Sequence, residues 1–185
     1  MFFLRKSPLE RLPVVMSGVR MGERALQIGV GDPSLVGAIA AKVGLSGHAS
    51  VAVAEARQAE RARAAAARAG ALVDVQMAPG GGALPFADAA FDVVVIHPGG
   101  LASPLHDAAG AAMLRDAHRM LRGGGRIVVI EGGGRGLAAR LRSTPLADAA
   151  PVLAALGAAG FKAARQLAER EGYRFLEGLK SDATP

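Results

Sequence analysis

Two glycines followed by a carboxylate form the pattern in this 185-residue sequence that is best suited to binding chemistry. Gly29 and Gly31 lie in "ALQIGVGDPS" (25–34), between an apolar run and a helix start. Glycines in such a turn let a ligand approach backbone N–H groups at a helix N-terminus. Glu55 ends the next apolar run, where an acid can accept hydrogen bonds from both hydroxyls of a ribose. The pattern favours a ribose-containing cofactor, either NAD or S-adenosylmethionine. The structural alternatives are a tight turn at the glycines and a helix-dipole acid at Glu55.

His97 is the histidine expected to face the same cleft, because it ends the β-branched run "FDVVVIH" (91–97). It is a candidate general base, and the alternative is a residue that only shapes the pocket. His48 and His118 are expected at surface or capping positions. The four histidines show no metal-ligand spacing, and the absence of cysteine excludes disulfides, thiolate metal sites and Cys nucleophiles. No metal is expected.

The segments that must position these residues alternate between strand and helix patterns. Short apolar runs predict five buried strands, at residues 25–30, 49–55, 71–78, 91–97 and 123–131. Helical spacing or composition predicts helices between and after them, at residues 33–43, 56–70, 107–121 and 145–161. Asp32 is expected to cap the first helix, with Pro33 in its first position and Gly44 at its end.

The end of the chain breaks the alternation. "KAARQLAER" and "YRFLEGLK" read as two strands joined by a tight turn at Gly172. Right-handed crossovers between parallel strands predict a doubly wound three-layer α/β sandwich. The expected fold is a mostly parallel seven-stranded sheet that ends in an antiparallel β-hairpin, with ligands at the carboxyl ends of the strands. We expect one domain over residues 21–185, preceded by an N-terminal extension over residues 1–20.

The order of these motifs resembles class I S-adenosylmethionine-dependent methyltransferases, in the branch of small-molecule enzymes of the ubiquinone/menaquinone-biosynthesis type. The resemblance rests on "ALQIGVGDPSL", "VAVAE", "ALPFADAAFDVVVIH", "MLRGGGRIVVIE" and "GFKAARQLAEREGYRFLEGLK", which together span most of the chain. The terminal hairpin, which ordinary NAD-binding Rossmann domains lack, makes the resemblance specific. Ser34 stands where the dinucleotide pattern has its third glycine.

The resemblance implies how the first motif would hold S-adenosylmethionine. Gly29 and Gly31 would lie under the methionine moiety of the cofactor. Gln27 occupies the position of the family's usual acid, so it can accept a hydrogen bond from the cofactor's ammonium but offers no charge. A charge-assisted hydrogen bond is roughly twice as strong as a neutral one. Pro33 takes the position of the motif's third glycine and removes an N–H donor.

The later motifs would hold the other end of the cofactor and the substrate. Glu55 would bind the ribose hydroxyls, Ala56 would lie against the adenine, and Leu84 in "ALPF" would help to close the adenine side. His97 would face the methionine part and the substrate. The family often has an acid near the adenine after the third strand, whereas this chain has "PGGG" at 79–82.

The implied reaction is methyl transfer to an O, N, C or S atom of an unidentified acceptor, with a small molecule as the first expectation. About 20 residues precede the first strand and no long insertion follows, so little chain covers the substrate side. The site is then open, completed by a second subunit in a homo-oligomer, or suited to a large acceptor. Two other functions are kept open. One is a non-catalytic member of the fold that serves as a partner subunit, and the other is an NAD(P)-binding enzyme.

Composition narrows the partners. The net charge of +6 invites nucleic acid as a partner. However, the arginines are scattered, and six Phe, one Tyr and no Trp leave little aromatic surface for stacking bases. Nucleic acid is therefore not expected. No apolar run reaches the roughly 18 residues of a membrane span, and the N-terminal apolar patch is too short for a signal peptide. We expect a cytoplasmic protein, with peripheral membrane contact through "MFFLRK" as a weaker alternative.

Overall fold

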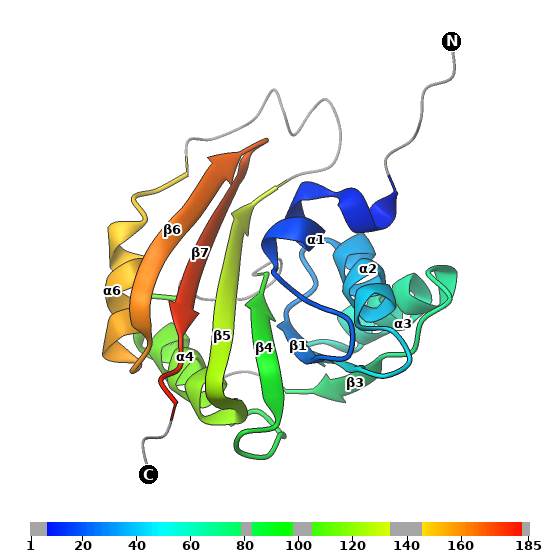
Figure 1. Ribbon diagram of the computed structural model, residues 1–185, viewed down its shortest axis with the longest axis horizontal. Helices are drawn as coiled ribbons and strands as arrows, with labels where there is room; N and C mark the ends of the chain where they lie inside the picture. Colours follow the sequence, from blue (N-terminus) through cyan, green and yellow to red (C-terminus); the bar gives the residue numbers. More distant parts are fainter. Residues whose placement is uncertain (1–6, 79–82, 98–104, 134–145, 183–185) are drawn as a thin grey trace.

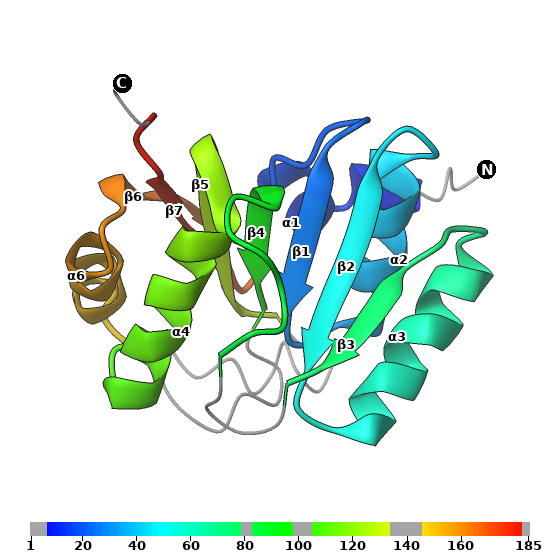
Figure 2. The same cartoon turned by 90° about the horizontal axis from the view of Figure 1, so that it is seen from below.

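The computed structural model describes residues 7–78, 83–97, 105–133 and 146–182. These residues form one seven-stranded sheet with helices on both faces, in the strand order β3-β2-β1-β4-β5-β7-β6 (Figures 1 and 2). The strands are β1 (Arg24–Ile28), β2 (His48–Val53), β3 (Asp74–Met77), β4 (Phe91–Ile96), β5 (Leu121–Gly132), β6 (Lys162–Arg170) and β7 (Tyr173–Leu179). β1 to β5 pair in parallel, and β7 pairs antiparallel with both β5 and β6. The predicted fold class is confirmed, including the terminal hairpin.

The helices form the two outer layers. They are η1 (Pro8–Glu10), α1 (Leu12–Met16), α2 (Pro33–Val43), α3 (Ala56–Arg68), α4 (Ala108–Met120) and α6 (Ala150–Ala158). Side chains of β4 alternate between the layers, because successive residues of a strand point to opposite faces. Val93 and Val95 pack with α1 and α2, whereas Val94 and Ile96 pack with α4 and α6. Burial on both faces explains why β4 is the most β-branched run of the chain.

Helix α2 begins and ends where the sequence predicts. The Asp32 carboxylate accepts a hydrogen bond from the Ser34 N–H at 2.9 Å, and Pro33 is the first helical residue. Gly44 ends α2 with a φ of +67°, a conformation that favours glycine. In the described part of the chain, no helix is long and apolar enough to cross a membrane.

Two strands, β3 and β5, begin more than one residue away from their predicted starts. β3 begins at Asp74 rather than at Ala71, because Ala71 still belongs to the end of α3. Its N–H bonds to the Ala66 carbonyl while Gly70 bonds to that of Ala67, the two hydrogen bonds of a Schellman motif. β5 begins at Leu121 rather than at Gly123, with an irregularity in its pairing with β4.

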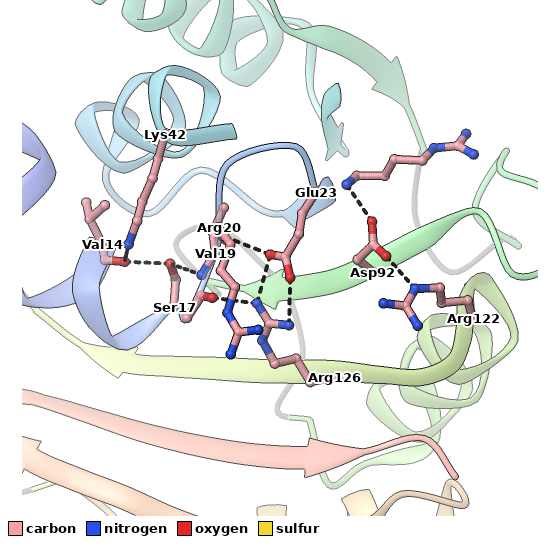
Figure 3. Close-up of polar contacts among 11 residues, drawn as sticks. Val14, Ser17, Val19, Arg20, Glu23, Lys42, Asp92, Arg122 and Arg126 are labelled. Atoms are coloured by element: carbon pink, nitrogen blue, oxygen red, sulfur yellow. Dashed lines mark hydrogen bonds and ion pairs between the residues drawn. The ribbon is translucent and has the colours of Figure 1, made fainter. Parts of the chain in front are cut away.

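Polar contacts tie the N-terminal segment to the amino edge of the sheet (Figure 3). Arg126 of β5 forms an ion pair with Glu23 at 2.8 Å and also donates to the carbonyl of Gly18. Asp92 of β4 accepts from the Arg24 N–H at 2.7 Å and from Arg122. Val14 and Val19 of this segment are buried against α2 and the sheet. The division into an extension and a domain stays a prediction.

Loss of the Glu23–Arg126 pair is expected to destabilise the fold. The two side chains are only 14% and 16% exposed, so Glu23→Ala leaves a mostly buried guanidinium without its carboxylate. We expect the free energy of unfolding to fall by about 1–3 kcal/mol, measured by urea denaturation. The control is Glu60→Ala, which breaks the exposed Arg63–Glu60 pair and should cost less than about 0.5 kcal/mol. Equal losses of stability in the two variants would contradict a stabilising role for the Glu23–Arg126 pair.

Candidate functional site

The residues singled out by the sequence lie at one edge of the sheet. Ile28 of β1 is level with Ala52 of β2 and with Ile96 of β4, and the three strands are parallel. Gly29, Glu55 and His97, which follow these strands, therefore meet at the carboxyl edge. In open parallel sheets this edge is where ligands bind.

Gly29 makes the turn that leaves the sheet. Its φ is +83°, which L side chains rarely adopt, and its N–H bonds to the Ala52 carbonyl at 3.0 Å. The glycine is thus required by the backbone, and the hydrogen bond holds the turn against β2. Gly31 follows as an exposed residue immediately before the capping Asp32.

Gln27 presents an unused acceptor beside this turn. Its side chain is 1% exposed, and Nε2 donates to the Gly29 carbonyl at 3.0 Å. That carbonyl can only accept, so the amide must turn its nitrogen toward it. Oε1 is then the one fully buried side-chain N or O atom among the described residues that lacks a hydrogen-bond partner. An orphaned buried acceptor costs about 1–3 kcal/mol, and a ligand ammonium would satisfy it.

Asp32 is held in its ionised form next to the turn. Burial alone would raise its pKa, but hydrogen bonds from Arg11 and Ser34 outweigh burial and bring the pKa below its ordinary value. Arg11, which precedes α1, forms an ion pair with Asp32 at 2.7 Å. The N-terminal segment is therefore fastened to the loop that follows β1, a contact that the sequence pattern did not predict.

The carboxylate of Glu55 does not cap helix α3. The residue occupies the N-cap position of α3 but makes no side-chain hydrogen bond to that helix. Gln58 supplies a contact there instead, since its Oε1 accepts from the Ala54 N–H at 3.3 Å. Glu55 and the adjacent Ala56 are both exposed. This geometry removes capping as the reason for an acid at position 55.

Leu84, which precedes β4, is held in place by contacts with α4. Its side chain is buried with Ile28 and Ala52, and its N–H donates to Asp116 of α4. Arg119 of the same helix donates to the carbonyls of Leu84 and Phe86, at 3.3 Å and 2.8 Å. The segment is thus fixed by two side chains that sequence analysis missed. Residues 79–82, where the family's acid was sought, lie outside the described residues.

His97 is locked between β1 and β5. Its main-chain N–H donates to the Ile28 carbonyl at 3.0 Å, and the ring atom Nδ1 lies 3.1 Å from the Ile130 carbonyl. A carbonyl can only accept, so Nδ1 carries the proton and Nε2 keeps its lone pair. The residue is 4% exposed, and this burial lowers the pKa of His97 below its ordinary value. His97 is therefore neutral at pH 7.

Sequence analysis missed a further titratable residue at this edge. Glu131 lies next to last in β5, one residue beyond the Ile130 carbonyl that holds His97. It forms an ion pair with Arg174 at 3.2 Å, yet burial raises its pKa above the ordinary value. Its position at the end of "GGGRIVVIE" was the available signal. Among the described residues, no three His, Asp or Glu side chains are grouped as metal ligands.

Comparison with known proteins places this geometry in context. A family model described as "Methyltransferase domain" matches residues 25–125. A SAM-dependent methyltransferase from Aquifex aeolicus is similar in structure, with a TM-score of 0.70 and 14% identity over 94% of this chain and 89% of that one. A SAM-dependent O-methyltransferase from Thermotoga maritima has a TM-score of 0.66 and 14% identity, over 92% and 64% of the two chains. PigF with SAH has a TM-score of 0.56 and 22% identity, over 85% and 50%. No curated protein matches the chain in sequence. At these identities the structural likeness concerns the fold.

Gly29→Ala should destabilise the protein because it places a Cβ at a φ of +83°. We expect a loss of about 1–2 kcal/mol in the free energy of unfolding. The matched control is Gly157→Ala, at an exposed position of α6 where a Cβ meets nothing within 4 Å. Helix propensity should make that variant more stable by up to about 1 kcal/mol. The free energy of unfolding of both variants is measured by urea denaturation. Changes of the same sign in the two variants would refute the prediction.

The buried His97 should make folding less favourable in acid. Its pKa is lowered in the native state, so below about pH 6.5 the unfolded chain takes up a proton that the folded chain resists. The stability contributed by neutral His97 is complete above that pH and is lost as the pH falls. The stability is measured by urea denaturation between about pH 7.5 and about pH 5.5, a range that brackets the ordinary histidine pKa. As the pH falls, the free energy of unfolding should decline less steeply in His97→Gln than in the wild type. The exposed His48→Gln is the control and should keep the wild-type slope.

Proposed function

We propose that this chain, which belongs to the family of methyltransferase domains, is a class I S-adenosylmethionine-dependent methyltransferase whose acceptor is a small molecule. The buried Oε1 of Gln27 carries the cofactor part of this proposal, because it is an acceptor without a partner that the cofactor's ammonium would satisfy. The ubiquinone/menaquinone-type branch stays a prediction.

The residues at the edge fit the parts of the cofactor. Gly29 and Gly31 would lie under the methionine moiety, where Gln27 Oε1 would accept from the ammonium. The positive φ at Gly29 and the exposed backbone of Gly31 support this placement. They leave the first turn free of side chains that would obstruct a ligand.

The ribose and adenine would lie over the ends of β2 and β3. Glu55 would accept hydrogen bonds from the ribose hydroxyls, and its freedom from helix capping supports that role. Ala56 presents a small exposed side chain next to it, against which an adenine can lie. Leu84, whose main chain is fixed to α4, would close the adenine side.

When bound, S-adenosylmethionine supplies a methyl group already activated on a sulfonium. The task left to the protein is to hold the acceptor in line with the methyl group and to exclude water. His97 is the residue that we propose to accept a proton from the acceptor. Its Nδ1–H is committed to the Ile130 carbonyl, which leaves Nε2 as the basic atom. Because burial lowers its pKa, His97 suits an acceptor that needs little help to lose its proton.

The other expectations about partners and location stay predictions. They are the cytoplasm as location, a homo-oligomer, and the absence of a nucleic-acid partner. The peripheral membrane contact was assigned to residues 1–6, which lie outside the described residues.

Isothermal titration with S-adenosylmethionine and S-adenosylhomocysteine tests the proposal first. We expect both ligands to bind the wild type, and Glu55→Ala to weaken binding about tenfold or more, because two hydrogen bonds to a charged acceptor are lost. Glu60→Ala removes another exposed acid of α3 and should bind like the wild type. No heat with either ligand would overturn the cofactor site and favour a partner subunit without catalysis. Equal losses in the two variants would overturn the role of Glu55.

A further inference from the structure

One arginine holds two carboxylates across three strands at the carboxyl end of β5. Arg174 of β7 lies opposite Glu131 of β5 and opposite Glu169 of β6. It bonds to Glu131 Oε2 at 3.2 Å and to Glu169 Oε2 at 2.9 Å, and it also donates to the Ala147 carbonyl. The arginine side chain is only 6% exposed. Two carboxylates on one guanidinium leave this group with a net charge of −1.

Glu131 stands at the rim of the site where methyl transfer would occur. Val129 of β5 is level with Ile96 of β4, so Glu131 lies beyond the last strand residue of β4. The carbonyl of the preceding Ile130 is the atom that holds His97 Nδ1 at 3.1 Å. One residue of β5 thus positions the proposed base, and the next carries a carboxylate.

The carboxylate of Glu131 is only half used. Arg174 contacts Oε2, and Oε1 makes no hydrogen bond in the described part of the chain. The single fully buried unpaired atom there belongs to Gln27, so Glu131 Oε1 is within reach of solvent. Arg174, Glu169 and His106 are the charged or titratable groups that act on Glu131. Burial is the largest influence and raises the pKa of Glu131, as expected for a carboxylate that has lost much of its hydration.

We propose that Glu131 is the specificity residue of this methyltransferase and that it binds a protonated amino group of the methyl acceptor. The inference rests on the proposed function and names the class of acceptor. A net charge of −1 at the rim repels carboxylate or phosphate acceptors and attracts a cation. An ammonium brings three donors and a charge to the open Oε1, whereas an alcohol brings one neutral donor. Arg174 fixes the carboxylate in place, so little side-chain entropy is lost on binding.

Ligands that differ only in their polar group test this assignment. Amines, alcohols and carboxylates that share a phenylethyl, indolylethyl or hexyl scaffold are titrated into the protein saturated with S-adenosylhomocysteine. We expect the amine of at least one scaffold to bind about tenfold more tightly than its matched alcohol, because it makes a charge-assisted contact. The matched carboxylate should bind most weakly. Equal affinities for amine and alcohol on every scaffold would overturn the inference.

Variants separate Glu131 from the general charge of this edge. Glu131→Gln should abolish the preference for amines while binding S-adenosylhomocysteine as the wild type does. Glu169→Gln removes the other carboxylate of Arg174, on the edge strand farther from β4, and should retain the preference. Retention of the preference in Glu131→Gln would overturn the assignment. If that variant fails to fold, Glu131→Asp, which retains the charge and draws it back, should weaken the preference.

The same titrations distinguish this inference from the proposed function. If S-adenosylhomocysteine does not bind the wild type, the proposed function fails and this inference fails with it. If it binds and no amine is preferred, the cofactor site stands and only the role of Glu131 is overturned. Binding of S-adenosylhomocysteine together with a preference for the amine that is lost in Glu131→Gln would support both.

Discussion

Two main-chain hydrogen bonds at the ends of the central strands hold the site together. The Gly29 N–H bonds to the Ala52 carbonyl, and the His97 N–H bonds to the Ile28 carbonyl, both at 3.0 Å. They continue the parallel pairing one residue past β1 and β4, into the segments that carry the proposed site. The turn after β1 and the histidine after β4 are therefore placed by the sheet and do not depend on loop packing. That rigidity is what a reaction governed by positioning requires.

The fold was predictable because each of its layers has a local signature. Strands buried on both faces read as continuous apolar runs, and "FDVVVIH" is the strongest example. Asp32, Pro33 and Gly44 bound their helix by capping chemistry that involves only near neighbours. A predicted strand start was wrong where a neighbouring helix uses the same main-chain groups. Ala71 was predicted to begin a strand, but its N–H bonds to the Ala66 carbonyl at the end of α3.

The placement of the candidate site residues was predictable only where it follows from the ends of strands. Gly29, Glu55 and His97 could be found because a strand must end near them, and parallel strands bring their ends together. The contacts that fix the site join distant parts of the chain, and no spacing encodes them. Arg11 reaches Asp32, Asp116 reaches the main chain of Leu84, and Arg174 reaches Glu131. Such pairs depend on which side chains the folded layers bring face to face.

The charges left at the edge suit a cationic cofactor. A protonated histidine would repel a sulfonium, and burial prevents it by lowering the pKa of His97. Gln27, which replaces the family's usual acid, contributes a neutral acceptor in a position that is 1% exposed, where an unpaired carboxylate would be costly. The negative charge lies instead at Glu55 and around Glu131, whereas His97 and Gln27 are neutral. Attraction for the cofactor and for a protonated amine would thus come from the rim, and the buried centre of the candidate site is left uncharged.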